Sequence, residues 1–285
     1  MTRDSRLLVL DLDNTLYDWV GSFVPAAYAM IEKASEILQI DQQRVIAELQ
    51  AVNQRHGDTE HPGAILEIES AHLKFGGNPE KIAESLRPAL VRFEQVNNHH
   101  LRLYPSVEET LSRAKAKNIL IVAYTDARVS ASLSRVNKLG LRKYLARLFT
   151  PDQKERRHAV ADQDMDFLNV LPQSERKPNP ATLLDICGRC GISRDEAIYV
   201  GDSLTRDIFM AREAGVLSAW ASYGTRYDPL LWEKLVAITH WTDEDVRKEA
   251  QVRERAAAVK PDIVLGSFGD LDPALRPVAT GSAIS

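Results

Sequence analysis

The stretch VLDLDNTLYD, residues 9–18, places two acidic side chains directly after a run of apolar residues. Leu7 to Leu10 have the composition of a buried strand, and Asp11 and Asp13 follow on the same side of an extended chain. Two carboxylates ~4 Å apart repel by about 4 kcal/mol at an effective dielectric near 20. A fold that keeps both ionised needs a cation or a shared proton nearby. Taken alone, the stretch also fits an ordinary strand end followed by an Asp-Asn turn.

Composition limits the classes of function. The chain has 285 residues, 44% hydrophobic and 27% charged, which is typical of globular proteins and enough for a core with a second lobe. The formal net charge is -4 and the basic residues are scattered, so a nucleic-acid polymer is not an expected partner. No apolar run approaches the ~20 residues of a membrane span, and the N-terminus lacks a signal-like segment. We expect a cytoplasmic monomer or homodimer that binds a small molecule and no membrane.

The apolar rhythm changes along the chain. Between residues 20 and 100, apolar residues recur three and four apart, with Gly, Pro or Asp at the breaks, which predicts helices throughout. From residue 102 onward, short apolar strands alternate with helices, and this alternation predicts a parallel sheet that also includes Leu7 to Leu10. The later predicted strands are Ile119–Tyr124, Leu148–Thr150, Ala197–Val200, Leu217–Ala221 and Ile263–Leu265.

These patterns predict an α/β fold with a Rossmann-like parallel sheet, helices on both of its faces and an inserted all-helical domain. The predicted boundaries are 1–18 and 101–285 for the α/β core and 19–100 for the helical domain. Two polar segments, 151–176 and 223–260, fit less well and are interpreted as solvated additions.

The chain contains two cysteines, Cys187 and Cys190, in the sequence CGRC. Such a pair can be a redox couple or half of a zinc site, but no second pair of ligands with suitable spacing lies nearby. Leu183, Cys187 and Cys190 are spaced i, i+4, i+7 in a helix predicted to begin at Pro180, which favours packing on one helix face.

Polar residues follow several predicted strands. Ligands of open α/β sheets bind beyond the carboxyl ends of the strands. Thr125 and Asp126 come directly after one strand, and Asp202 and Asp207 lie in GDSLTRD after another. Lys177, in RKPNP before a predicted helix, is a candidate to join them.

The four motifs DLDNT, YTD, KP and GDSLTRD, in this order, resemble those of the haloacid dehalogenase superfamily. The resemblance covers residues 5–17 and 102–270. The helical block between the first and second motifs resembles the branch with a helical cap over the active site, as in phosphoglycolate phosphatases and many nucleotidases. The resemblance implies a phosphatase, with the helical block acting as a cap domain.

The resemblance also assigns catalytic roles. Asp11 is the expected nucleophile, which forms an aspartyl phosphate. Asp13 is the expected general acid and base, which protonates the leaving alkoxide and then takes a proton from water. The expected cofactor is Mg²⁺, a cation that prefers oxygen ligands, held by Asp11, Asp202 and the backbone carbonyl of Asp13, whose side chain stays free.

The remaining motif residues are expected to bind or orient. Thr125 and Lys177 would bind the non-bridging phosphate oxygens, and Asp126 is a candidate contact of the substrate loop. Asp207 would orient Lys177 or a metal-bound water. The alternatives are a strand-end turn for Thr125 and Asp126, a solvent-facing lysine, and a surface acid at position 207.

The predicted function is a magnesium-dependent phosphomonoesterase acting on a small phosphorylated metabolite: a nucleotide, a sugar phosphate or a phosphoglycolate-like compound. The alternatives are a phosphomutase, a 2-haloacid dehalogenase, a phosphorylation-switch receiver domain and a non-catalytic phosphate-binding module. Asp13 and Asp202 argue against the dehalogenase, whose chemistry does not require a metal. The candidate substrate contacts in the cap are Tyr28, Arg55, His56, Lys74 and Arg92.

Overall fold

The computed structural model describes residues 6–61, 63–151, 164, 166–241, 247 and 259–275. The chain divides into two compact units. The α/β unit comprises Met1–Asp18, Leu103–Arg226 and Val252–Ser285, and the helical unit comprises Trp19–Arg102 and Tyr227–Gln251. Each unit is described by itself.

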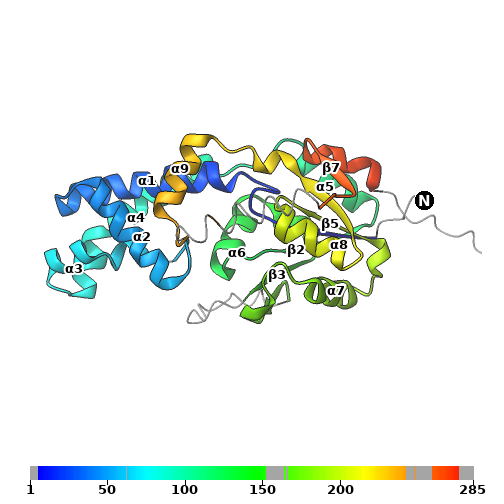
Figure 1. Cartoon of the computed structure of the whole chain (residues 1–285), viewed down its shortest axis with the longest axis horizontal. Helices are drawn as coiled ribbons and strands as arrows, with labels where there is room; N and C mark the ends of the chain where they lie inside the picture. The colour runs from blue at the N-terminus through cyan, green and yellow to red at the C-terminus, as the bar shows by residue number, and fades with distance from the viewer. Residues whose placement is uncertain are drawn as a thin grey trace, which may run out of the picture. The chain divides into compact units, whose positions relative to one another are not determined.

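In the described part of the α/β unit, seven strands form one sheet in the spatial order β4-β3-β2-β1-β5-β6-β7. Figure 1 labels β2, β3, β5 and β7 of this sheet. All adjacent strands are parallel. The strands are β1 (Leu7–Leu10), β2 (Leu120–Tyr124), β3 (Arg147–Pro151), β4 (Leu168–Leu171), β5 (Ala197–Gly201), β6 (Leu217–Ala221) and β7 (Ile263–Leu265). The predicted α/β class with a parallel sheet is confirmed.

The strands agree with the apolar runs of the sequence, with one exception. β1, β6 and β7 have the predicted bounds, and β2, β3 and β5 differ by one or two residues. The exception is β4, which lies in the segment 151–176 that was interpreted as a solvated addition. β4 pairs with β3 at the edge of the sheet, and three of its four side chains are at least partly exposed. A half-exposed edge strand has no continuous apolar run, so the sequence pattern did not reveal it.

Helices cover both faces of the sheet. The helices of the α/β unit are α5 (Val107–Ala116), α6 (Val129–Lys138), α7 (Pro180–Arg189) and α8 (Phe209–Glu213). Val9 and Tyr199 share a buried cluster with Leu183 and Cys187 of α7 and with Met210 of α8. The predicted packing of Cys187 on a helix face is therefore confirmed.

The neighbouring strand residues face the opposite side of the sheet, because side chains alternate along a strand. Leu8, Leu10 and Ile121 are also fully or almost fully buried. On the helix side, α5 contacts β2 and α6 contacts β3. Burial of both faces explains why the central strands are apolar throughout.

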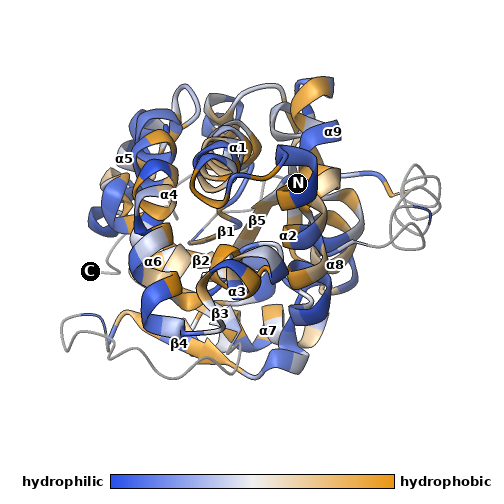
Figure 2. Cartoon of the chain, turned by 90° about the vertical axis from the view of Figure 1, so that its left-hand side faces the viewer, coloured by the Kyte–Doolittle hydropathy of each residue, from blue (hydrophilic) through white to orange (hydrophobic). Residues whose placement is uncertain are grey.

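The helical unit contains five α-helices among the described residues: α1 (Trp19–Leu38), α2 (Gln42–His56), α3 (Glu69–Phe75), α4 (Pro79–His100) and α9 (Pro229–Ile238). α1 packs extensively against α4. Hydrophilic and hydrophobic residues both occur along α1 and α4 (Figure 2). No helix in the described ranges is long and apolar enough to cross a membrane.

Helix α9 belongs to the helical unit, although the sequence analysis placed all of residues 101–285 in the α/β core. Leu235 and Ile238 of α9 are buried in the same cluster as Val45 and Leu49 of α2. The buried Asn53 side chain of α2 donates a hydrogen bond to the Ile238 carbonyl oxygen, at 2.7 Å. The sequence analysis interpreted this segment as a solvated addition and did not predict that α9 is packed in the core of the helical unit. Much of the remainder of the segment 223–260 lies outside the described residues.

We predict that Asn53→Ala lowers the free energy of unfolding of the helical unit by about 1–3 kcal/mol, because the buried Ile238 carbonyl loses its partner. Gln54→Ala is the matched control, since Gln54 makes an exposed 3.4 Å bond to the Trp241 carbonyl. The control should change unfolding very little. Chemical denaturation followed by circular dichroism measures both variants. Equal stabilities of the two variants would contradict the placement of α9.

Candidate active site

The site begins at the end of β1, in the middle of the sheet. β1 lies between β2 and β5, and Leu10 is in register with Ala123 and Val200. The backbone N–H of Asp11 donates to the Val200 carbonyl oxygen at 2.9 Å, so Asp11 emerges at the carboxyl edge of the sheet. After β1 the chain continues to β2 on one side, and after β5 to β6 on the other. Such a reversal opens a crevice for ligands beyond the strand ends.

The loop after Asp11 is tightly folded. The Leu16 N–H donates to the Leu12 carbonyl oxygen, and the Asn14 N–H to the Tyr17 carbonyl oxygen, both at 2.9 Å. Asn14 has φ 57°, a left-handed conformation that asparagine tolerates better than most residues. The backbone of Gly224 lies against the Asn14 carbonyl oxygen, where a Cβ atom would clash. Backbone hydrogen bonds within the loop and the close contact with Gly224 therefore fix the conformation of the DLDNT motif.

Lys177 is the charge at the centre of the site. Its Nζ donates to Asp11 Oδ1 at 2.6 Å, to Asp207 Oδ1 at 2.8 Å and to the Tyr199 hydroxyl oxygen at 3.2 Å. An ammonium group has three donors, and these three acceptors match them. Only 9% of Lys177 is exposed, which is unusual for lysine unless the residue is paired. The interpretation of Lys177 as a solvent-facing loop residue is therefore wrong.

Asp207 is buried directly beside Lys177, with 1% of its surface exposed. It lies in a π-helical turn, Leu204–Ile208, that leads into α8. Its Oδ2 accepts a hydrogen bond from the Ser203 N–H at 3.0 Å, and its Oδ1 accepts one from the Tyr199 hydroxyl at 2.8 Å. A Cβ atom at Gly201 would overlap the Asp207 carboxyl group, so the glycine before Asp202 leaves space for Asp207. The interpretation of Asp207 as a surface acid is wrong.

Three carboxylates gather around this lysine. Oxygen atoms of Asp11, Asp202 and Asp207 lie within 4.8 Å of one another. The Asp202 carbonyl oxygen accepts a hydrogen bond from Trp220 Nε1 at 2.8 Å, which holds the residue in place after β5. Carboxylate oxygens at such distances are the donor set that hard divalent cations prefer. The structure thus has a possible acidic metal-binding group.

Burial and charge act differently on the two aspartates that contact Lys177. Burial raises the pKa of Asp11 well above its usual value, and the charges of Asp207 and Asp202 raise it further, although Lys177 opposes them. Burial also acts to raise the pKa of Asp207, but the Lys177 charge, its hydrogen bond and the Ser203 N–H together lower it. The surroundings of Asp207 thus favour its ionised form beside Lys177. A cation added near Asp11 would favour the ionised form of Asp11 in the same way.

Thr125 and Asp126, the two residues that follow β2, make different contacts. Thr125 is buried at the strand end, and its hydroxyl oxygen accepts a hydrogen bond from the Ala127 N–H at 3.1 Å. Asp126 Oδ1 accepts a hydrogen bond from the Lys177 backbone N–H at 3.1 Å. Asp126 thus contacts the segment that carries Lys177. Thr125 itself makes no hydrogen bond to Asp11 or Lys177 in the described part of the chain.

Asp13 is the predicted site residue whose surroundings differ most from expectation. Its side chain was expected to be free, but Arg135 Nη1 of α6 donates to Asp13 Oδ1 at 2.9 Å and to Oδ2 at 3.3 Å. Burial and the Asp13 charge both raise the pKa of the buried Tyr17 hydroxyl well above its usual value. The Asp13 carboxylate is held by its ion pair with Arg135.

Several contacts of the predicted site were not predicted, among them those of Thr15, Tyr199 and Arg135. The Thr15 hydroxyl donates to Asp11 Oδ2 at 3.2 Å, and Tyr199 bridges Lys177 and Asp207. Arg135 contacts Asp13 across a separation of 122 residues. Thr15 belongs to the DLDNT motif and could have been found there. Tyr199 is one of the apolar positions of β5, and no sequence signal distinguishes Arg135 from the other arginines.

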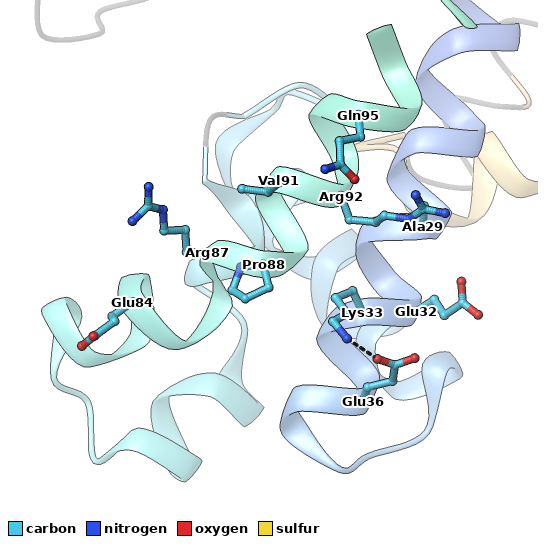
Figure 3. Close-up of a pocket in the computed structure, with 10 residues that line it drawn as sticks. All are labelled: Ala29, Glu32, Lys33, Glu36, Glu84, Arg87, Pro88, Val91, Arg92 and Gln95. Atoms are coloured by element: carbon cyan, nitrogen blue, oxygen red, sulfur yellow. Dashed lines mark hydrogen bonds and ion pairs between the residues drawn. The ribbon is translucent and has the colours of Figure 1, made fainter. Parts of the chain in front are cut away.

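The candidate substrate contacts in the helical unit have varied local environments. Arg92 lines an open pocket of about 730 Å³ between α1 and α4, together with Lys33, Glu36 and Arg87 (Figure 3). Lys33 forms an ion pair with Glu36 at 2.7 Å. Tyr28, Arg55, His56 and Lys74 do not line it. The pocket mixes both signs of charge on exposed helix faces, which does not indicate a catalytic site.

A second cluster of possible metal ligands lies within the helical unit. Nε2 of His56 and Nε2 of His61 are each 2.8 Å from a different oxygen of Glu67. The two imidazole rings stack with centroids 3.5 Å apart and an interplanar angle of 8°. The possible ligand atoms of the three residues lie within 4.8 Å of one another, and each imidazole has its own oxygen of Glu67 as a hydrogen-bond partner.

Comparison with known proteins identifies the family. A family model described as haloacid dehalogenase-like hydrolase matches residues 6–215, and a second, described as HAD-hydrolase-like, matches residues 174–271. The first covers most of the chain. The chain therefore belongs to the haloacid dehalogenase-like hydrolase family, as its motifs predicted.

Relatives and solved structures agree with this assignment. A phosphoglycolate phosphatase from Vibrio vulnificus strain CMCP6 is 30% identical over 227 residues, which cover 78% of this chain and 86% of that protein. A glyceraldehyde 3-phosphate phosphatase from Methanopyrus kandleri is 24% identical over 227 residues, with the same coverages of 78% and 86%. The crystal structure of a predicted phosphoglycolate phosphatase from Haemophilus somnus 129PT aligns with a TM-score of 0.50 and 18% identity, covering 94% of this chain and 97% of that one. The structural match supports the fold, and the phosphatase names of the relatives agree with the predicted class, a hydrolase of phosphoric monoesters.

We predict that Lys177→Met lowers the free energy of unfolding of the α/β unit by about 3–5 kcal/mol in the presence of a chelator, because two buried carboxylates lose their counter-charge. Lys143→Met is the matched control, since Lys143 forms an exposed ion pair with Glu108. Unfolding of the control should match the wild type. Denaturant titrations measure both variants, and equal stabilities would contradict the central position of Lys177.

Proposed function

We propose that this chain is a magnesium-dependent phosphomonoesterase that acts through an aspartyl phosphate on Asp11. The observation that carries the proposal is the 2.6 Å contact between the buried Asp11 carboxylate and Lys177 at the end of the central strand. Asp202 lies within reach of the same carboxylate, and Asp13 follows two residues later in a fixed loop. The phosphatase relatives support the same reaction class.

The donor set fits Mg²⁺. Asp11 and Asp202 would hold the ion through carboxylate oxygens, and Asp13 through its backbone carbonyl. Asp207 stays paired with Lys177, from whose ammonium group it accepts a hydrogen bond, and does not need to bind the ion directly. When bound, the cation offsets the charge of the carboxylates and of the phosphoryl group.

Asp11 would attack phosphorus in line with the leaving group. Its two oxygens have different partners, Lys177 for Oδ1 and Thr15 for Oδ2, and these contacts restrict rotation of the carboxylate. The new Asp11 O–P bond forms as the bond from phosphorus to the alcohol oxygen breaks. This covalent step divides one difficult hydrolysis into two easier displacements.

Asp13 would move the protons in both steps. It donates a proton to the departing alkoxide in the first step and accepts one from the attacking water in the second, which releases inorganic phosphate and restores Asp11. The Lys177 ammonium would offset charge on the non-bridging oxygens, and Thr125 at the end of β2 would orient them. Asp126 would fix the loop that carries Lys177, through the hydrogen bond that it accepts from the Lys177 N–H.

The helical unit would act as the cap that selects the substrate, with residues 19–100 as its main part and α9 as an addition. A small phosphorylated metabolite is the proposed substrate, from the nucleotide, sugar phosphate or phosphoglycolate-like classes. The phosphoglycolate and glyceraldehyde 3-phosphate phosphatases among the relatives favour short phosphorylated acids and aldehydes as the first compounds to test.

We predict that turnover of p-nitrophenyl phosphate requires Mg²⁺ and stops in excess chelator. Mg²⁺ at 100 times its dissociation constant should stabilise the native state by about 2.7 kcal/mol, because the ion binds only the folded chain. Asp202→Asn should raise the Mg²⁺ concentration needed for half-maximal turnover. Phosphate release and thermal melting, each titrated with Mg²⁺, measure these effects.

Asp185→Asn is the matched control, since Asp185 forms an exposed ion pair with Arg189 on α7. Its magnesium requirement should equal that of the wild type. Full activity of the wild type in excess chelator would overturn the metal assignment. Release of halide from a 2-haloacid, with no release of phosphate from any ester, would replace the phosphatase by the dehalogenase alternative.

A further inference from the structure

Arg135 is a buried arginine that has no role in the reaction proposed above. It lies on α6, and only 7% of its surface is exposed. Its neighbours on the buried face of the helix are Ser132 and Val136. A guanidinium group loses several kcal/mol of hydration when it is buried, so a buried arginine requires strong partners. Its Nη1 donates to both oxygens of Asp13.

The helix that carries Arg135 is anchored beside the site. The Thr150 hydroxyl at the end of β3 donates to the Ala127 carbonyl oxygen at 2.6 Å, just before α6 begins. The Ser132 hydroxyl donates to the Arg128 carbonyl oxygen at 2.7 Å. A group held by an anchored helix is placed more exactly than one on a free loop. Arg135 therefore reaches Asp13 from a rigid support.

Stability alone does not account for this ion pair. The pair is partly buried, with Arg135 buried and Asp13 half-buried, and the hydration that Arg135 loses offsets much of the attraction. An apolar residue would fill the same position on α6 without that loss. What the pair provides is orientation, since one Nη1 between two carboxylate oxygens limits rotation of the Asp13 side chain.

We propose that Arg135 is a positioning residue that holds the Asp13 carboxylate in the orientation needed for proton transfer to the leaving group and from water. The inference rests on the proposed function and extends it: Arg135 acts through Asp13, whose carboxylate it contacts. Misplacement of a catalytic group by about 1 Å can lower a rate by about 10²-fold.

The role of Arg135 predicts a dependence on the leaving group. Arg135→Met should lower kcat for an alkyl phosphate such as glycerol 1-phosphate by about 10²-fold, with little change in KM, because Arg135 does not bind the phosphate. The rate of the first nitrophenolate burst from p-nitrophenyl phosphate should change much less, because nitrophenolate leaves without a proton. The amplitude of the burst equals the number of correctly folded active sites. It therefore distinguishes a variant that is partly unfolded from one that is folded but slow. Arg135→Lys should recover part of the alkyl phosphate rate.

A double-mutant cycle separates positioning from a structural role. Asp13→Asn with Arg135→Met should be no slower than Asp13→Asn alone, because the arginine then has no carboxylate to orient. Arg113→Met is the matched control, since Arg113 pairs with Asp272 at 2.6 Å elsewhere in the α/β unit. Its rates should equal those of the wild type.

Three results would overturn the inference. The first is a wild-type rate of Arg135→Met with the alkyl phosphate. The second is a loss in the nitrophenolate burst rate equal to the loss in kcat for the alkyl phosphate. The third is a further loss in the double variant equal to that of Arg135→Met alone. In each of these cases the wild-type chain still hydrolyses phosphate esters, so the proposed function survives. A wild-type chain that hydrolyses neither ester would overturn the proposed function and this inference together.

Discussion

The whole site depends on one buried ammonium group between two buried carboxylates. Lys177 joins the end of β1, through Asp11, to the π-helical turn after β5, through Asp207. These segments are far apart in the sequence, and the lysine arrives from a third segment just before α7. Removing Lys177 leaves both carboxylates buried without a counter-charge, which is costly in an interior of low dielectric. The ion pairs of Lys177 thus hold the end of β1 and the turn after β5 close together.

The same cluster contains more acidic than basic groups. Asp11, Asp202 and Asp207 bring three carboxylates around Lys177, and burial raises the pKa of Asp11. In the proposed mechanism the Asp11 carboxylate must be ionised to react, and a divalent ion bound beside it would favour that form. The backbone is shaped to permit this crowding, because Gly201 makes room for the Asp207 carboxyl group and Gly224 for the Asn14 carbonyl. The carboxylates are thereby held close together, and a divalent cation would relieve the repulsion between them.

Much of the fold was predictable because buried parallel strands have continuous apolar runs. β1, β6 and β7 match their predicted bounds, and Asp11, Asp202 and Asp207 lie together at the sheet edge, as expected for acids that follow strands. β4 was missed because its side chains are half-exposed, and α9 was misplaced because an amphipathic helix does not specify its partner. Tertiary packing decided both cases.

The side-chain contacts of the site were less predictable than its positions. Motif order indicated Lys177, but not that Tyr199 would accept one of its three hydrogen bonds. Arg135 and Asp13 are 122 residues apart in the sequence, and no local sequence pattern predicts that they form an ion pair. Local patterns therefore specify which residues stand at the strand ends, whereas the packing of helices against the sheet specifies which charges meet.

The most direct test of the central claim is to trap the covalent intermediate. The wild-type chain would be mixed with Mg²⁺ and p-nitrophenyl phosphate, quenched in acid within milliseconds to seconds, digested and analysed by mass spectrometry. The account predicts a mass increase of one phosphoryl group on the peptide that carries residues 7–18, located on Asp11 and absent from Asp11→Asn. Full turnover with no phosphoryl group on that peptide at any time, or with the group on another residue, would contradict it.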